Sequence, residues 1–107
     1  MVKADLDQIL WKDPWNFEIS DLEEELAREV SSQHPLAGAE AIAVARRCDN
    51  DDVLFFLPNH DPPLAVVHLT WHRESGPAWP FTVFCYSVED FITKHIEQDH
   101  KKHLGVL

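Results

Sequence analysis

The sequence predicts an α+β fold: a four-stranded antiparallel meander with an acidic N-terminal helix and a C-terminal helix. Dense apolar runs recur between residues 51 and 91, and residues typical of turns separate them. A capped helical pattern follows the last run directly. The chain has 107 residues, the length of one domain, so residues 1–107 are expected to form a single α+β unit.

The first substantial helix is expected to begin at Ser20 and to end before His34-Pro35. Ser20 and Glu23 have the spacing of a capping box, in which each side chain bonds to the other residue's backbone amide. Acidic residues fill the first turn, where the helix dipole favours negative charge. A shorter helical pattern at residues 5–11 precedes this helix. The apolar residues at helical spacing are Ile19, Leu22, Leu26 and Val30.

Four strands are expected at residues 39–48, 53–57, 64–71 and 81–86. The first is rich in alanine, which also favours a helix, but the turn residues after it suit a hairpin. The second is apolar on both faces, so it is expected at the centre of the sheet with both faces covered. In the third, the period of two places Trp71 in the core and Thr70 on the opposite face. On that register, Trp71→Ala would cost about 3–5 kcal/mol.

The C-terminal helix is expected to begin at a Ser87 cap, with Asp90 three residues later. Both helices are expected to pack on one face of the sheet, as in segregated α+β domains. The N-terminal segment or a second subunit is then expected to cover the other face, so a homodimer is an open alternative.

Acidity is the strongest functional signal in the chain. The formal net charge is −10, and residues 1–52 hold 13 acidic and 5 basic side chains, a net charge of −8. Such a field repels nucleic acid and anionic membranes, and it attracts a basic protein. No apolar run approaches the roughly 18–20 residues of a membrane span, and the first residues lack the apolar region of a secretory signal. A cytoplasmic protein is therefore expected.

Two sites are predicted. The first is an acidic surface on the helix after Ser20 that contacts a basic partner, as an immunity or regulatory protein does. Its residues are Glu23, Glu24, Glu25 and Glu29. The alternative is a small enzyme or ligand-binding domain with a pocket near the end of the third strand. The pocket residues are His68, Thr70, His72 and Trp79.

Catalytic and cofactor motifs are not readable in this chain, so no catalytic residue, cofactor or metal is expected. The three glycines are isolated and cannot form a phosphate-binding loop. His68 and His72 would lie about 13 Å apart along a strand, too far for one zinc ion. EDTA is therefore expected to leave the melting temperature unchanged. Cys85 lies in an apolar run, where burial makes a thiol inert.

The pattern VVHLTW, with the P-x-T and S-x-E-D-F that follow it, resembles a family of small bacterial proteins. The resemblance covers roughly residues 38–99, and it implies no activity and no site. The strong acidity in a small α+β domain is also similar to the composition of toxin-immunity proteins, which implies a non-enzymatic binding role.

Overall fold

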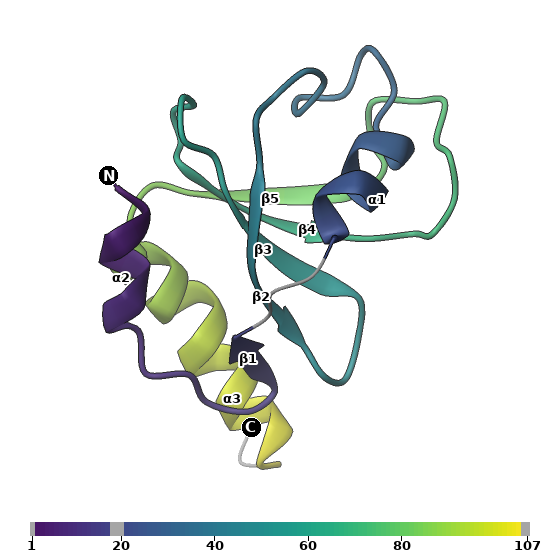
Figure 1. The fold of residues 1–107 in the computed structure, drawn as a ribbon. Helices are drawn as coiled ribbons and strands as arrows, with labels where there is room; N and C mark the ends of the chain where they lie inside the picture. Colours follow the sequence, from purple (N-terminus) through teal and green to yellow (C-terminus); the bar gives the residue numbers. More distant parts are fainter. Residues whose placement is uncertain (1, 18–20, 106–107) are drawn as a thin grey trace.

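The computed structural model describes residues 2–17 and 21–105 (Figure 1). The elements in chain order are η1 (Lys3–Gln8), β1 (Trp15–Phe17), α1 (Leu22–Glu29), β2 (Ile42–Arg47), β3 (Asp52–Phe56), β4 (Leu64–His68), β5 (Phe81–Cys85), α2 (Val88–Phe91), η2 (Ile92–Glu97) and α3 (Gln98–His103). None of the helices among the described residues is long and apolar enough to cross a membrane.

The strands form one antiparallel sheet in the order β1-β2-β3-β4-β5. The α+β class and the antiparallel sheet are confirmed, but the predicted count of four strands is wrong because β1 adds a fifth. Trp15 of β1 pairs with Arg47 of β2 at the edge of the sheet. A three-residue strand is too short to reveal a period of two, so the sequence pattern missed it.

The predicted acidic N-terminal helix is not matched either. The chain begins with η1, a 3-10 helix, followed by β1, and α1 comes only after them. Ser20 and Ile19 lie outside the described residues, so the predicted capping box does too. The residue at the N-cap of α1 is Asp21, and its side chain makes no capping hydrogen bond.

At the other end of the chain, α2, the π-helical segment η2 and α3 follow one another directly. The predicted cap is present, because the Asp90 amide donates to Ser87 Oγ at 3.0 Å. The Asp90 carboxylate in turn accepts a hydrogen bond from the Tyr86 amide at 2.9 Å. Two reciprocal hydrogen bonds therefore stabilise the N-terminus of α2.

Helical segments cover both faces of the sheet, and the expectation that they share one face is wrong (Figure 1). On one face, η1 and the C-terminal helices pack over a core that contains Leu6, Trp15, Leu54, Phe56, Leu64, Val66, Phe91 and Ile96. On the other, α1 and the segment after it cover Val53, Phe55, Leu57, Ala65, Val67 and Leu69. The doubly apolar β3 therefore lies at the centre of the sheet, as its sequence predicts.

A β-bulge interrupts the period of two in the alanine-rich strand β2. The pairing of β2 with β3 shifts between Ala43 and Ala45, so Val44 and Ala45 both join the core beneath the C-terminal helices. A bulge inserts one residue into a strand and changes which side chains share a face. The Glu23 carboxylate accepts the Ala43 amide at 2.9 Å, so α1 supports the bulge.

The register predicted for the third strand holds only as far as Leu69. Ala65, Val67 and Leu69 share one core cluster, but β4 ends at His68 and the chain then turns away. Trp71 lies at φ 60° with 44% of its surface exposed, so its predicted place in the core is wrong. Trp71→Ala is now expected to cost less than about 1 kcal/mol, which is usual for exposed positions.

Candidate protein-binding surface

The four acidic residues predicted to bind a partner have different surroundings on α1. Glu24 is exposed, whereas Glu23 is half-buried and bonded to the Ala43 amide. The Glu25 carboxylate forms a bidentate pair with Arg28, with N–O distances of 2.7 and 3.0 Å. Glu29 is fully buried. Much of the acidity of α1 therefore serves the fold, and Glu24 is the member of this set that faces solvent.

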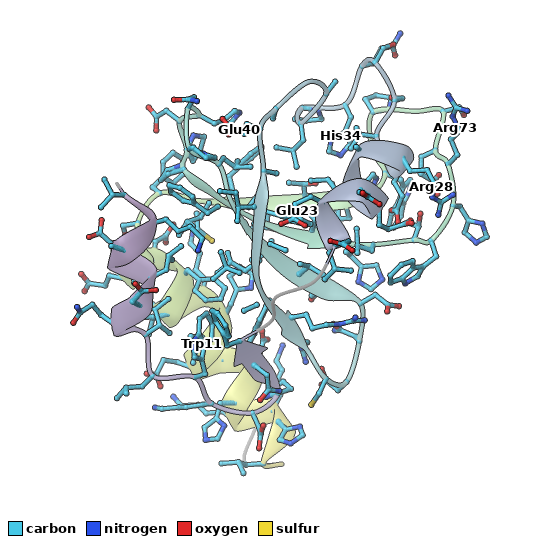
Figure 2. All side chains as sticks on the ribbon, in the orientation of Figure 1. Trp11, Glu23, Arg28, His34, Glu40 and Arg73 are labelled. Atoms are coloured by element: carbon cyan, nitrogen blue, oxygen red, sulfur yellow. The ribbon has the colours of Figure 1, made fainter. Side chains whose placement is uncertain are left out.

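Glu29 binds the start of the 69–80 loop, which connects β4 to β5. Its Oε1 accepts the Thr70 amide at 2.8 Å and lies 3.1 Å from the Thr70 hydroxyl. Its Oε2 accepts the Trp71 amide at 2.9 Å. The Glu29 carbonyl accepts the Glu74 amide at 3.1 Å, so side chain and backbone both attach the loop to the end of α1. Figure 2 shows Arg28 on α1 and Arg73 on this loop at the same side of the molecule.

The titration of Glu29 reflects this enclosed position. Burial raises the pKa of the Glu29 carboxyl, and its hydrogen bond with Glu25 raises it further, while the Thr70 and Trp71 amides act in the opposite direction. Burial also opposes ionisation of Glu25, but its hydrogen bonds with Glu29 and Arg28 outweigh burial and lower the pKa of that carboxyl. Negative charge in this pair therefore resides preferentially on Glu25, beside Arg28.

Large aromatic side chains are exposed on the loop and just beyond it. Trp71 is 44% exposed, and Trp79 and Phe81 are 49% and 56% exposed. The rings of Trp79 and Phe81 lie 6.3 Å apart between centroids and form a small cluster where the loop joins β5. Exposed tryptophans are unusual on protein surfaces and frequent at the centres of binding interfaces.

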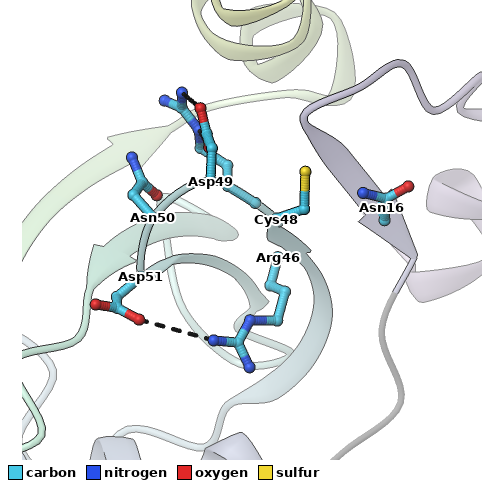
Figure 3. Close-up of a pocket in the computed structure, with 7 residues that line it drawn as sticks. Asn16, Arg46, Cys48, Asp49, Asn50 and Asp51 are labelled. Carbon is cyan, nitrogen blue, oxygen red and sulfur yellow. Dashed lines mark hydrogen bonds and ion pairs between the residues drawn. The ribbon is translucent and has the colours of Figure 1, made fainter. Parts of the chain in front are cut away.

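The four residues predicted to line a pocket lie at the end of β4 and along the 69–80 loop. His68 ends β4, Thr70 lies against Glu29, and His72 and Trp79 are exposed on the 69–80 loop. A hollow of about 500 Å³ lies elsewhere, at the turn between β2 and β3 (Figure 3). It is open and polar, and its lining residues are Asn16, Arg46, Arg47, Cys48, Asp49, Asn50 and Asp51.

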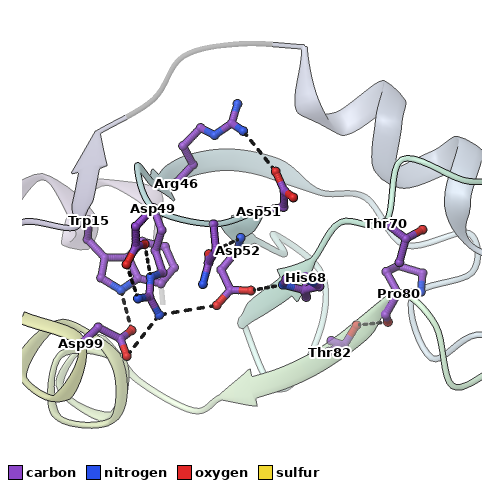
Figure 4. Close-up of polar contacts among 12 residues, drawn as sticks. Trp15, Arg46, Asp49, Asp51, Asp52, His68, Thr70, Pro80, Thr82 and Asp99 are labelled. Carbon is purple, nitrogen blue, oxygen red and sulfur yellow. Dashed lines mark hydrogen bonds and ion pairs between the residues drawn. The ribbon is translucent and has the colours of Figure 1, made fainter. Parts of the chain in front are cut away.

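His68 instead ends a row of polar contacts that crosses the sheet beneath α3 (Figure 4). Trp15 Nε1 donates to Asp99 at 2.8 Å, and Arg47 lies 3.3 Å from the same carboxylate. Arg47 also lies 3.8 Å from Asp52, whose other oxygen accepts the His68 Nδ1 proton at 2.7 Å. Because a carboxylate oxygen can only accept, Nδ1 is the ring nitrogen of His68 that carries the proton in this bond.

His95 lies at the edge of the same row, on η2. Its ring packs against Phe91 and Trp15 with centroid distances of 5.6 and 6.3 Å. Its Nε2 is buried and has no hydrogen-bond partner among the described residues. Burial lowers the pKa of His95 below its usual 6.5, while Asp99 and Asp52 act against this shift.

We expect His95 to make the fold acid-sensitive. The unfolded chain binds a proton at His95 more readily than the native protein, so stability rises with pH across this titration and is lost as the pH falls from about 7 to about 5. His95→Leu should flatten that part of the pH profile of the unfolding free energy, measured by urea denaturation. The difference between the two profiles isolates His95, because all other groups titrate in both proteins. Parallel profiles would contradict this expectation.

Groups that could support metal or nucleophilic chemistry are sparse among residues 2–17 and 21–105. No set of three or more His, Cys, Asp or Glu side chains there is positioned to hold a metal ion. Burial raises the pKa of the Cys85 thiol to about 11, so this thiol is protonated at neutral pH.

No protein-family model, curated protein or solved structure matches this chain. The resemblance to a small bacterial family and the similarity to toxin-immunity proteins therefore stay predictions. The attachment of the 69–80 loop to Glu29 was missed by sequence reasoning, because Glu29 continues a run of acids that reads as a solvated face.

Proposed function

We propose that the protein is a non-enzymatic binding protein that engages a basic protein partner through the 69–80 loop. The observation that carries this proposal is Trp71, an exposed aromatic residue held in a left-handed backbone conformation by the buried carboxylate of Glu29. A non-glycine residue in that region costs about 1–3 kcal/mol, and such strain concentrates at functional sites.

The loop is attached before any partner arrives. Bonds from Thr70, Trp71 and Glu74 to Glu29 fix its first half. Ser31 Oγ donates to the Gly76 carbonyl at 3.2 Å, and the Pro80 carbonyl accepts a bond from the buried His34 at 2.9 Å. A preorganised loop loses less conformational entropy on binding, so exposed aromatic side chains on it contribute more of their contact energy to affinity.

Charge and aromatic chemistry both favour a basic partner. The net charge of −10 steers a positively charged protein toward this one. Tryptophan faces bind arginine and lysine side chains through cation–π contacts of about 0.5–2 kcal/mol. Glu74 is three residues after Trp71 in the same loop, with its carboxylate 2.8 Å from the Thr70 hydroxyl, and it supplies a negative charge for such a cation. The residues that contact the partner are therefore assigned to the loop. Glu29 is assigned the role of holding the loop in place.

The test is capture of partners from an extract of the source cells with the immobilised protein. We expect a basic protein to be retained at about 0.1 M salt and released near 1 M, where charge screening is strong. The double variant Trp71→Ala and Trp79→Ala should lose this protein while its melting curve stays close to that of the unchanged chain. Leu10→Ala is the matched control, because Leu10 is an 81% exposed apolar residue outside the loop. Retention that the double variant does not affect would refute the proposal.

Glu24 allows a kinetic test of steering with the captured protein. We expect Glu24→Lys to slow association severalfold at low salt and to leave dissociation nearly unchanged, because peripheral charges act on encounter more than on the bound state. Surface-binding kinetics measure both rates. The effect should vanish at about 1 M salt, where the Debye length is about 3 Å. If neither salt nor Glu24→Lys changes the association rate, the acidic surface does not steer the partner.

A small enzyme or ligand-binding domain remains the second candidate, favoured by the bond from His68 to Asp52. A carboxylate that orients a histidine is the arrangement of a general base. A small-molecule screen that follows the imidazole signals of His68 by NMR separates the candidates. Saturable shifts in those signals would support a ligand site there, and the basic-partner proposal requires none.

A further inference from the structure

Strand β5 forms one edge of the sheet, and the hydrogen-bond pattern shows which of its backbone groups face outward. The Leu57 amide donates to Pro63 and the Leu69 amide to Asp51, so odd-numbered residues of the β4 segment bond toward β3. Backbone direction alternates along a strand, so Leu64, Val66 and His68 bond toward β5. Their partners there are Phe81, Val83 and Cys85. The N–H and C=O groups of Thr82 and Phe84 therefore point away from the sheet.

The two ends of this edge are closed, and its middle is open. The Pro80 carbonyl is taken by His34 and the Thr82 hydroxyl, and the Tyr86 amide by Asp90. Among residues 2–17 and 21–105, no hydrogen bond reaches the outward backbone groups of Thr82 and Phe84. Strand β5 also has no charged residue, proline or bulge, the features that usually keep edge strands from pairing. The opposite edge, β1, is only three residues long.

We infer that an extended, basic segment of the partner adds to the sheet along β5, an inference that rests on the proposed function. Its backbone would form up to four hydrogen bonds with Thr82 and Phe84, as in β-strand addition. Side chains on one face of the added segment would meet Phe81 and Val83, which are exposed and half-buried. A basic segment is favoured over an acidic one because the chain it joins carries a net charge of −10.

This edge is continuous with the 69–80 loop. Trp79 contacts Phe81 at the start of β5, and the exposed ring of Tyr86 follows its end. One extended segment along β5 would therefore reach the aromatic cluster already assigned to partner contact. A second copy of the chain could pair with the same edge, but each copy carries the same net negative charge, which opposes association.

The experiment uses a short peptide of alternating lysine and valine residues as the probe. We expect its addition to shift the ¹H–¹⁵N signals of Thr82 and Phe84 saturably. A peptide with the same side chains but N-methylated backbone amides cannot donate to the edge, and its affinity should fall about tenfold or more, the equivalent of about 1.4 kcal/mol. A glutamate–valine peptide should not bind.

Thr82→Pro tests the edge from the other side. It removes an outward N–H without touching the bonds to β4, a position where edge strands tolerate proline. It should weaken the lysine–valine peptide about tenfold, whereas Thr82→Val, which keeps the backbone amide and removes only the hydroxyl, should not. Circular dichroism and melting curves establish that both variants fold.

Several outcomes would overturn the inference. These are equal binding of the N-methylated or the glutamate peptide, the absence of shifts at the two amides, and a dimer of the chain itself that Thr82→Pro dissociates. If the N-methylated peptide binds normally and the double variant Trp71→Ala and Trp79→Ala removes that binding, strand addition fails while the proposed function stands. If neither peptide binding nor the capture of a basic protein responds to the tryptophans, the proposed function fails.

Discussion

Replacing Trp15 with alanine is expected to lower the free energy of unfolding by about 3–5 kcal/mol, the range for buried tryptophan. Trp15 is fully buried although it lies on the three-residue edge strand β1. Its ring packs edge-on against Phe91 with a centroid distance of 5.2 Å, and Nε1 donates to Asp99. The substitution leaves a cavity and also leaves the Asp99 carboxylate with one donor fewer. Urea denaturation followed by circular dichroism measures the loss.

A second variant separates packing from hydrogen bonding at this position. Trp15→Phe keeps an aromatic ring against Phe91 but loses the indole N–H and the volume of the second ring, so it should cost about 1–3 kcal/mol, less than Trp15→Ala. Trp79→Ala is the control, because Trp79 is exposed and should change stability by less than about 1 kcal/mol. Equal losses at Trp15 and Trp79 would show that β1 does not dock as described.

Glu29→Ala is expected to give the second large effect, a loss of about 2–3 kcal/mol, because it removes the acceptor of the Thr70 and Trp71 amides. The loss should stay below the full penalty for two unpaired amides, since the freed loop can turn them toward water. Hydrogen exchange at the Thr70 and Trp71 amides should accelerate, because both amides lose the carboxylate that accepts their hydrogen bonds.

Glu24→Ala is the matched control for this experiment, because it removes an exposed carboxylate from the same helix. It should change stability by no more than about 0.5 kcal/mol and leave exchange at Thr70 and Trp71 unaltered. Similar losses of stability in Glu24→Ala and Glu29→Ala would mean that the charge of the helix, and not the hydrogen bonds from Glu29 to the loop, determines the effect.

The sequence predicted those parts of the fold whose signals are local. The alternation at Ala65 and Val67 and the cap at Ser87 each appear within a few residues, and the structure confirms them. Strand β1 and the bulge in β2 were not predicted. A three-residue strand shows no period, and the bulge depends on partners in β3 and α1 that the local pattern does not contain.

The surface was harder to predict for a different reason. Glu24 and Glu29 look alike in a run of acids, yet one faces solvent and the other is buried beneath the 69–80 loop. Trp71 extended an alternating pattern, but the two amides that bind Glu29 turn the backbone before the pattern can continue. The burial of Glu29 and the turn at Trp71 both depend on hydrogen bonds between residues about 40 positions apart. A sequence periodicity does not reveal such bonds.

The contact between Trp15 and Asp99 has a consequence for the order of events during synthesis. The two residues are 84 positions apart, and the Asp13 carbonyl likewise meets His100. A ribosome adds about 5–20 residues each second. Strand β1 therefore emerges several seconds before the helix that buries its tryptophan exists. During that interval Trp15 has no helix to cover it, and the nascent chain is most exposed to chaperones and to wrong contacts until α3 closes over it.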